Sequence, residues 1–177
     1  MKRIFLVLLA LSLPFFLFAS LSLALSADAG VLQDFAIRNS SYNFDIDARC
    51  KLTQAFEVRL PVGIVWNNNA KMFDLGLSLN YYPFDNLGLF VGLSLIQFGF
   101  VSPEGLLSKS TINLNEVSVG WTFETKSGLF AEPSILIRDP SGTFSDEYSM
   151  IKGAFPCYKN FRARIMCGYK FKIAQSK

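Results

Sequence analysis

Acidic and basic side chains recur at alternate positions along much of this 177-residue chain, and they are the residues best suited to chemistry. Within residues 42–53, for example, Asp45, Asp47 and Arg49 alternate with apolar residues. Successive side chains of a β-strand point to opposite faces, so alternate residues share one face. The spacing therefore predicts a charge network on one face of a sheet, formed by Asp45, Asp47, Arg49, Glu57, Arg59, Asp74, Glu116, Glu124, Glu132, Arg138, Arg162 and Arg164.

The remaining reactive residue types do not form a catalytic set. The sequence contains no histidine, so a serine–histidine hydrolase mechanism is excluded in its usual form. Cys50 and Cys167 alternate in phase with apolar residues, where a thiolate is disfavoured, and Cys157 has no evident base nearby. Neither cysteine–histidine metal spacing nor a glycine-rich phosphate loop occurs. We therefore expect no enzymatic activity, no metal site and no cofactor.

The elements that must position these charges are β-strands. Seven segments show the two-residue alternation, and no helical periodicity of comparable length competes with it. These segments are residues 42–52, 56–66, 73–81, 87–95, 116–124, 129–138 and 161–173.

The joints between these segments alternate in length. Short joints at 52–54, 83–86 and 126–128 alternate with longer ones, including 102–110 and 139–160. This alternation is typical of antiparallel barrels in the bacterial outer membrane. An even strand number requires an eighth strand, which residues 31–38 supply best. In the alternative count, residues 147–157 form the eighth strand and 31–38 are an unpaired lead-in.

The N-terminus resembles a secretory signal. Lys2 and Arg3 precede a long apolar run that ends in small residues at 24–30. We predict a signal peptide at 1–26 and a barrel domain at 27–177, with cleavage after Ser26, or after Ala29 as second choice. The alternative is an uncleaved anchor, since about 20 apolar residues span a bilayer. Losing both basic residues lowers the net charge from +3 to +1, which argues against a nucleic-acid-binding surface.

The apolar face of the predicted sheet could face inward, as in a soluble barrel, or outward toward lipid. The charged face is also rich in Gly, Ser and Asn, which suit a narrow polar lumen, and strands of this length can span a bilayer. Aromatic residues lie near the strand ends, as in the girdles of membrane barrels. This predicted girdle consists of Trp66, Tyr81, Trp121, Tyr169 and Phe171. The pattern favours the outward orientation.

The segment 96–101 breaks the alternation. Continued in phase, it would place Ile96, Phe98 and Phe100 on the inward face. One interpretation is a β-bulge that turns these side chains outward, since bulges are frequent at barrel rims. The other is an apolar entrance, as a carrier of hydrophobic molecules would need. We favour the bulge.

Two segments carry a resemblance to a known group of proteins. Residues 81–92, YYPFDNLGLFVG, resemble a strand–turn–strand unit, and residues 161–171, which end in GYKF, resemble a C-terminal assembly signal. The chain is thereby similar to the small outer-membrane β-barrels of diderm bacteria, the OmpA/OmpX/OmpW-like group. The resemblance implies export to the outer membrane, contact with its lipid, and recognition of the C-terminal strand by the barrel assembly machinery. Residues 172–177 would form a short periplasmic tail.

The expected function is a structural or surface-interaction role for a non-enzymatic barrel with a filled lumen. An eight-stranded barrel is about wide enough for its own side chains, and unpaired buried charges are costly, so we expect the charges to pair. Joints 102–110 and 139–160 would contact any extracellular ligand or host surface. The alternatives are a narrow channel or carrier for small or hydrophobic solutes, and a soluble periplasmic barrel that binds a ligand.

Overall fold

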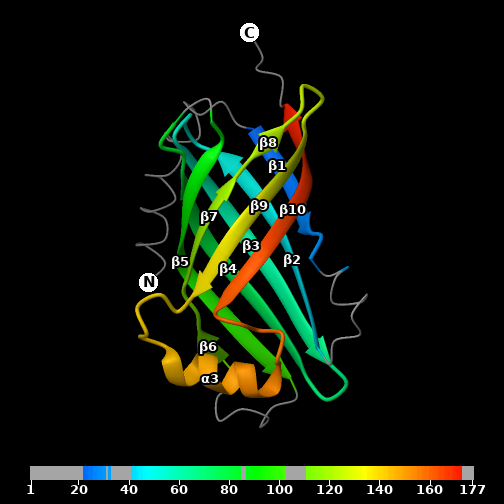
Figure 1. Ribbon diagram of the computed structural model, residues 1–177, viewed down its shortest axis with the longest axis vertical. Helices are drawn as coiled ribbons and strands as arrows, with labels where there is room; N and C mark the ends of the chain where they lie inside the picture. The colour runs from blue at the N-terminus through cyan, green and yellow to red at the C-terminus, as the bar shows by residue number, and fades with distance from the viewer. Residues whose placement is uncertain (1–21, 31, 33–40, 85–86, 103–110, 173–177) are drawn as a thin grey trace, which may run out of the picture.

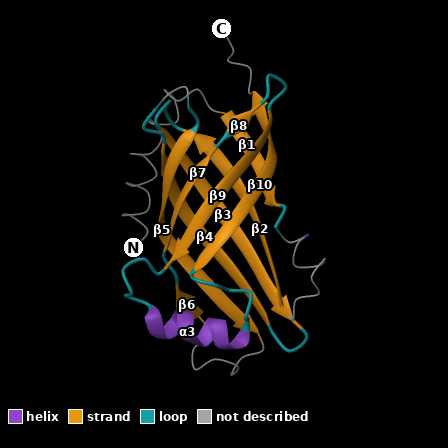
Figure 2. Ribbon diagram, in the orientation of Figure 1, coloured by secondary structure: helices purple, strands orange, loops and turns teal. Residues whose placement is uncertain are grey.

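The computed structural model describes residues 22–30, 32, 41–84, 87–102 and 111–172. These residues form an all-β antiparallel barrel, with the helix α3 (Ser145–Ala154) lying across one end (Figures 1 and 2). The strands are β1 (Ser22–Asp28), β2 (Ser41–Lys51), β3 (Phe56–Asn67), β4 (Lys71–Tyr81), β5 (Leu89–Ser102), β6 (Thr111–Asn113), β7 (Glu116–Trp121), β8 (Phe123–Glu124), β9 (Leu129–Arg138) and β10 (Phe161–Lys172).

The short strands β6, β7 and β8 together occupy one position in the barrel wall. β6 and β7 pair with β5, while β7 and β8 pair with β9. Each other strand pairs with its neighbours in the chain, and β10 pairs with both β9 and β1. The described residues therefore form a closed, eight-stranded, up-and-down barrel, and the predicted fold class and strand number are confirmed.

The first strand is β1, which the sequence pattern did not reveal. It pairs with β2 and with β10, and the pair Ala27–Cys167 lies in this closing seam. β1 alternates like the other strands, because Ala24, Ser26 and Asp28 are buried while Leu25 faces outward. This alternation is hidden in the sequence because the Leu-rich strand continues the apolar run of the predicted signal peptide.

The barrel thus begins before the predicted boundary between residues 26 and 27. Cleavage after Ser26 would remove most of β1, and cleavage after Ala29 would remove all of it. Residues 1–21 lie outside the described residues, so the signal peptide itself stays a prediction. The preferred eighth strand at 31–38 also lies outside them, apart from Leu32, and β1 holds the position assigned to it.

The alternative eighth strand at 147–157 is wrong, because most of this segment belongs to α3. Tyr148 and Ile151 lie three residues apart, so they share one face of a helix, and both are buried. Asp146 and Glu147 occupy the first turn and Lys152 the last, the arrangement that the helix dipole favours. Helical spacing of the apolar residues therefore decides the local structure.

The connections between strands define two ends of the barrel. We call the end formed by residues 52–55, 82–84, 87–88 and 125–128 the short-turn end, where β1 begins and β10 ends. We call the opposite end the long-loop end. It carries residues 68–70 and residues 139–160 with α3, and it is the end where β1 and β5 finish and where β2 and β6 begin (Figure 1). The long connection 139–160 lies at the long-loop end, as the sequence predicts, but the connection 68–70 at the same end has only three residues and departs from the predicted alternation of lengths.

The predicted bulge is confirmed in β5. Leu77 pairs with Ile96 while Ser78 pairs with Ser94, so β5 contains one extra residue at this point. The bulge resets the alternation, so that Ile96, Phe98 and Phe100 face outward. The alternative of an apolar entrance formed by these three side chains is therefore wrong.

The closing seam can be tested by crosslinking. Ala27 lies opposite the native Cys167, whereas Leu25 lies opposite Tyr169. In a background with Cys50→Ser and Cys157→Ser, we expect Ala27→Cys to form a disulfide with Cys167 on mild oxidation, because paired strands bring Cα atoms within disulfide range. Mobility on a non-reducing gel reports the bond. The matched control, Leu25→Cys, should crosslink poorly, and equal crosslinking of both variants would contradict this register.

Candidate functional site

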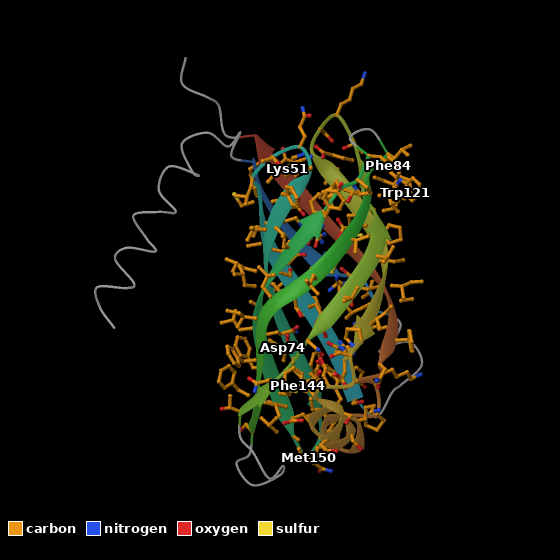
Figure 3. The ribbon with its side chains drawn as sticks, turned by 90° about the vertical axis from the view of Figure 1, so that its left-hand side faces the viewer. Lys51, Asp74, Phe84, Trp121, Phe144 and Met150 are labelled. Carbon is orange, nitrogen blue, oxygen red and sulfur yellow. The ribbon has the colours of Figure 1, made fainter. Side chains whose placement is uncertain are left out.

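Charged and apolar side chains are separated onto opposite faces of the barrel wall. Arg49, Arg59 and Glu132 are no more than 3 % exposed, whereas outward-facing residues such as Leu60 and Ile135 are more than half exposed. Figure 3 shows the outward side chains standing away from the barrel on all visible sides. The lumen therefore holds the charges, and the outer surface is apolar.

The central contact of the lumen is a clamp around Glu132, a fully buried residue of β9. Its carboxylate accepts hydrogen bonds from Arg49 Nη1 at 2.7 Å and from Arg59 Nη2 at 2.9 Å. Arg59 Nη1 donates a third bond and the Thr122 hydroxyl a fourth, the latter at 2.9 Å. Arg49 and Arg59 come from β2 and β3, so Glu132 ties these two strands to β9 across the lumen.

Further acidic groups complete the coordination of the two arginines. Asp47 accepts a hydrogen bond from Arg49 Nε at 3.0 Å and another from the Ser26 hydroxyl. Glu57 accepts a bond from Arg59 Nε at 2.7 Å. This central network of two cations and three carboxylates spans the lumen.

Aromatic rings cover the faces of both guanidinium groups. The Arg49 guanidinium carbon lies 4.4 Å from the ring centroid of Phe130, and that of Arg59 lies 4.9 Å from the Phe90 centroid. Tyr82 adds a hydroxyl that donates to Glu57 Oε1 at 3.1 Å. The central network is therefore packed by rings, which favours a fixed arrangement.

A second group of charges lies toward the long-loop end. Arg162 bonds to Asp28 and, through Nη1, to Asp45 at 3.1 Å. Arg164 Nη1 lies 3.9 Å from the same Asp45. These residues come from β10, β1 and β2, so their ion pairs reinforce the closing seam from inside.

The other predicted charges lie apart from these two groups. Arg138 Nε bonds to Glu116 at 2.9 Å, and Lys170 Nζ bonds to Glu124 at 2.7 Å at the short-turn end. Asp74 is buried opposite Gly63, and Gln97 Nε2 donates to it at 3.3 Å. The structure thus brings most of the predicted charges into contact with opposite charges inside the barrel, while Glu124 is half-exposed at its rim.

Sequence reasoning missed several polar partners of this interior. Ser26 and Asp28 belong to the hidden first strand, so their role depends on recognising β1. Thr122 lies between β7 and β8, at a polar position of the alternating segment 116–124, but the predicted network contains charged residues alone. Tyr82 lies just after β4, where the regular alternation stops, so only a search for polar side chains beside the predicted strand ends could have suggested it.

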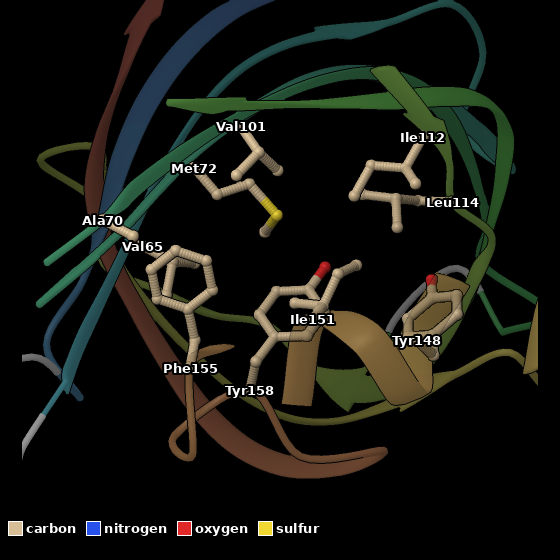
Figure 4. Packing of buried hydrophobic residues seen from close by; sticks show 10 residues of the cluster. All are labelled: Val65, Ala70, Met72, Val101, Ile112, Leu114, Tyr148, Ile151, Phe155 and Tyr158. Carbon is tan, nitrogen blue, oxygen red and sulfur yellow. The ribbon is translucent and has the colours of Figure 1, made fainter. Parts of the chain in front are cut away.

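An apolar core closes the long-loop end (Figure 4). Tyr148 and Ile151 of α3, with Phe155 and Tyr158 after it, pack against buried side chains on the inner wall. The wall residues of this core are Val65, Ala70, Met72, Val101, Ile112 and Leu114. The sequence indicates these residues where the alternation places an apolar side chain on the otherwise polar inner face, near the long-loop end of a strand. Val65, Met72 and Val101 are examples.

Hydrogen bonds fix this plug, meaning α3 and residues 155–158, to the barrel. The Tyr148 hydroxyl donates to the Asn115 carbonyl at 2.8 Å and accepts from its N–H at 3.0 Å. Asn67 Nδ2 donates to the Ala154 carbonyl at 2.8 Å. Burial raises the pKa of the Tyr148 and Tyr158 phenols, so both stay neutral as the apolar core requires.

A cavity of about 600 Å³ occupies the short-turn end of the lumen. Arg49, Glu57 and Phe130 line it where it meets the central network, and Lys51 and Lys170 line it nearer the rim. Within the described residues, no group of three or more His, Cys, Asp or Glu side chains is arranged to hold a metal ion. The interior therefore consists of a cavity, a charged barrier and a plug, in that order.

Comparisons with known proteins give two similar structures. No protein-family model matches the chain, and no curated protein sequence matches it. One solved structure of a designed transmembrane β-barrel has a TM-score of 0.46 at 12 % identity, covering 86 % of this chain and 97 % of that chain. A second de novo designed protein, solved by NMR in solution, has a TM-score of 0.40 at 12 % identity, covering 88 % of this chain and 95 % of that chain. Likenesses this distant carry no argument about function.

The clamp around Glu132 predicts a large effect of a nearly isosteric substitution. Glu132→Gln replaces the carboxylate that both buried guanidinium groups share with a neutral amide, whose NH2 group cannot accept their hydrogen bonds, so we expect a loss of about 3 kcal/mol in the free energy of unfolding. Urea titration of the detergent-folded barrel, followed by tryptophan fluorescence, measures this loss. The matched control is Glu124→Gln, which removes a half-exposed ion pair and should cost less than about 1 kcal/mol. Equal losses in the two variants would contradict a central role for the clamp.

Proposed function

We propose that the chain is an outer-membrane β-barrel with a structural or surface-interaction role, a blocked lumen and no enzymatic activity. The observation that carries this proposal is the apolar outer surface of a closed sheet whose charges face inward. Exposed large apolar side chains occur on every long strand from β2 to β10, as Ile46, Leu75 and Leu93 illustrate. A soluble barrel places such side chains inside, so lipid is the solvent that fits this surface.

Outward-facing aromatic rings near both ends support insertion in a bilayer. Tyr81, Trp121, Tyr169 and Phe171 of the predicted girdle lie at the short-turn end, all partly exposed. Trp66 lies at the long-loop end, where it stacks on Tyr42 with 5.4 Å between ring centroids. Amphipathic rings at two levels match the two interfaces of a membrane.

Closure of the barrel gives the first and last strands a hydrogen-bonding partner on both sides, which the hydrocarbon core of a membrane requires. A backbone N–H or C=O without a partner costs several kcal/mol there, so an open sheet edge is not tolerated. Pairing of β1 with β10 removes both edges. In the described part of the chain, no helix is both long and apolar enough to span a membrane.

The orientation follows from the connections. The short-turn end, where the chain enters and leaves the barrel, would face the periplasm, and α3 would face outward from the cell. This arrangement fits the OmpA/OmpX/OmpW-like group suggested by the sequence. The C-terminal strand β10 would be recognised by the barrel assembly machinery, and surface contacts with a ligand or host would form at α3 and the neighbouring loops.

Membrane insertion can be tested with tryptophan, because the chain contains only Trp66 and Trp121. In lipid vesicles, phospholipids brominated on the acyl chain should quench both residues in the single-tryptophan variants Trp121→Phe and Trp66→Phe. As a control, Ser149→Trp in a tryptophan-free background places the reporter on the exposed face of α3 and should not be quenched. Absence of quenching at both native tryptophans would contradict the proposal.

The blocked lumen predicts an absence of conductance. The plug and the central network are two barriers in series, so planar bilayers containing the protein should show no single-channel steps. Replacing residues 145–154 with a Gly-Ser linker should also give a silent barrel, because the Glu132 clamp still fills the lumen. Regular conductance steps from the unaltered protein would favour the channel alternative instead.

A further inference from the structure

The cavity at the short-turn end is a recess closed on its inner side by the central network. Its volume of about 600 Å³ falls in the range of small-molecule sites. The space exists partly because Ala24 of β1 presents only a methyl group there, between its register partners Arg49 and Lys170. A longer side chain at this position would fill the recess.

The charges that line the cavity are unevenly paired. Arg49 and Glu57 belong to the central network, and Lys170 is bound to Glu124. Lys51 differs from them, because no carboxylate among the described residues lies within ion-pair distance of its ammonium group. Its Nζ lies 5.3 Å from the ring centroid of Tyr82. The lining thus offers one ammonium group that has no carboxylate partner among the described residues and is available to bind an anion.

Apolar side chains complete the lining of the cavity. Pairing of β5 with β7 ends at Leu89–Trp121, beyond which the Thr122 N–H donates to the Gly88 carbonyl at 2.8 Å. Past that bond, β8 pairs with β9, and the described residues give it no partner on the β5 side. Leu87, Trp121 and Phe123 therefore line the cavity and are also exposed at the rim.

We propose that this cavity binds a small amphipathic anion, an organic carboxylate or phosphate with an apolar body. The anionic group would bond to the Lys51 ammonium, with Lys170 beside it, while the apolar body would contact Trp121 and Phe123. Figure 3 shows Lys51 and Trp121 at the same end of the barrel. The site is independent of transport, because the central network closes its inner side.

A tryptophan reporter tests this site directly. In Trp66→Phe, the remaining Trp121 lies in the wall of the cavity, and in Trp121→Phe the remaining Trp66 lies at the opposite end. The probe is nitrophenylbutyrate, whose nitro group quenches tryptophan on contact, added to the barrel in nanodiscs of phosphatidylcholine. We expect saturable quenching of Trp121 and only weak, linear quenching of Trp66.

The charge dependence of the signal identifies the anion site. The neutral nitrophenylbutanol and the cationic nitrophenylbutylamine should bind roughly tenfold more weakly than the acid, as expected for loss of a charge-assisted hydrogen bond. Lys51→Met should remove this preference. The matched control is Lys126→Met, which changes a lysine of the neighbouring turn that does not line the cavity and should leave the preference intact.

Three results would overturn the proposal: non-saturable quenching, equal affinity for acid and alcohol, or an unchanged preference in Lys51→Met. Slower gel migration after boiling shows separately that each variant has folded. Repeating the titration with an anionic phospholipid in the nanodisc identifies the source of the natural ligand. If that lipid weakens binding to the native lining but not to Lys51→Met, a lipid headgroup occupies the site. If it has no effect, the ligand is a free small molecule.

Discussion

A charge buried in the barrel interior must be paired with a charge of opposite sign, and the arrangement of the barrel depends on this constraint. Glu132 has no exposed surface, and it lies between arginines from the opposite wall. Removing either arginine would leave three buried carboxylates with one cation in a poorly solvating interior, where unpaired charge is strongly unfavourable. The pairs cross the lumen, so they hold strands together that share no backbone hydrogen bonds. The interior therefore adds to the stability that the sheet provides.

The two ends of the lumen differ in the side chains that occupy them. Toward α3, apolar side chains replace the charges, and Arg138 lies with its guanidinium carbon 3.6 Å from the Tyr158 ring centroid at the boundary. Toward the short turns, side chains are too small or too outward-facing to fill the space, and a cavity remains. The barrel is thus sealed at one end and recessed at the other, which suits surface exposure at the sealed end.

Alternation in the sequence predicts the regular part of this structure well. Strands such as β2 and β3 contain strict two-residue repeats, and the inward charges follow directly from them. Three features escape the pattern for separate reasons. β1 continues the apolar run of the predicted signal peptide, so its alternation is hidden. α3 is a helix of mixed composition in a segment expected to be a loop. The cavity exists because the small side chain of Ala24 leaves space unfilled. Periodicity reports which face a residue occupies, but it does not report how completely neighbours fill the space.

The pairing of the first strand with the last has a consequence for folding. β1 and β10 are separated by nearly the whole chain, so the contact between them is strongly non-local, and such contacts form slowly. Until β10 pairs with it, β1 has a row of unpaired backbone groups along one edge. An open strand edge favours aggregation, so we expect the incomplete chain to need protection from aggregation until β10 has been synthesised.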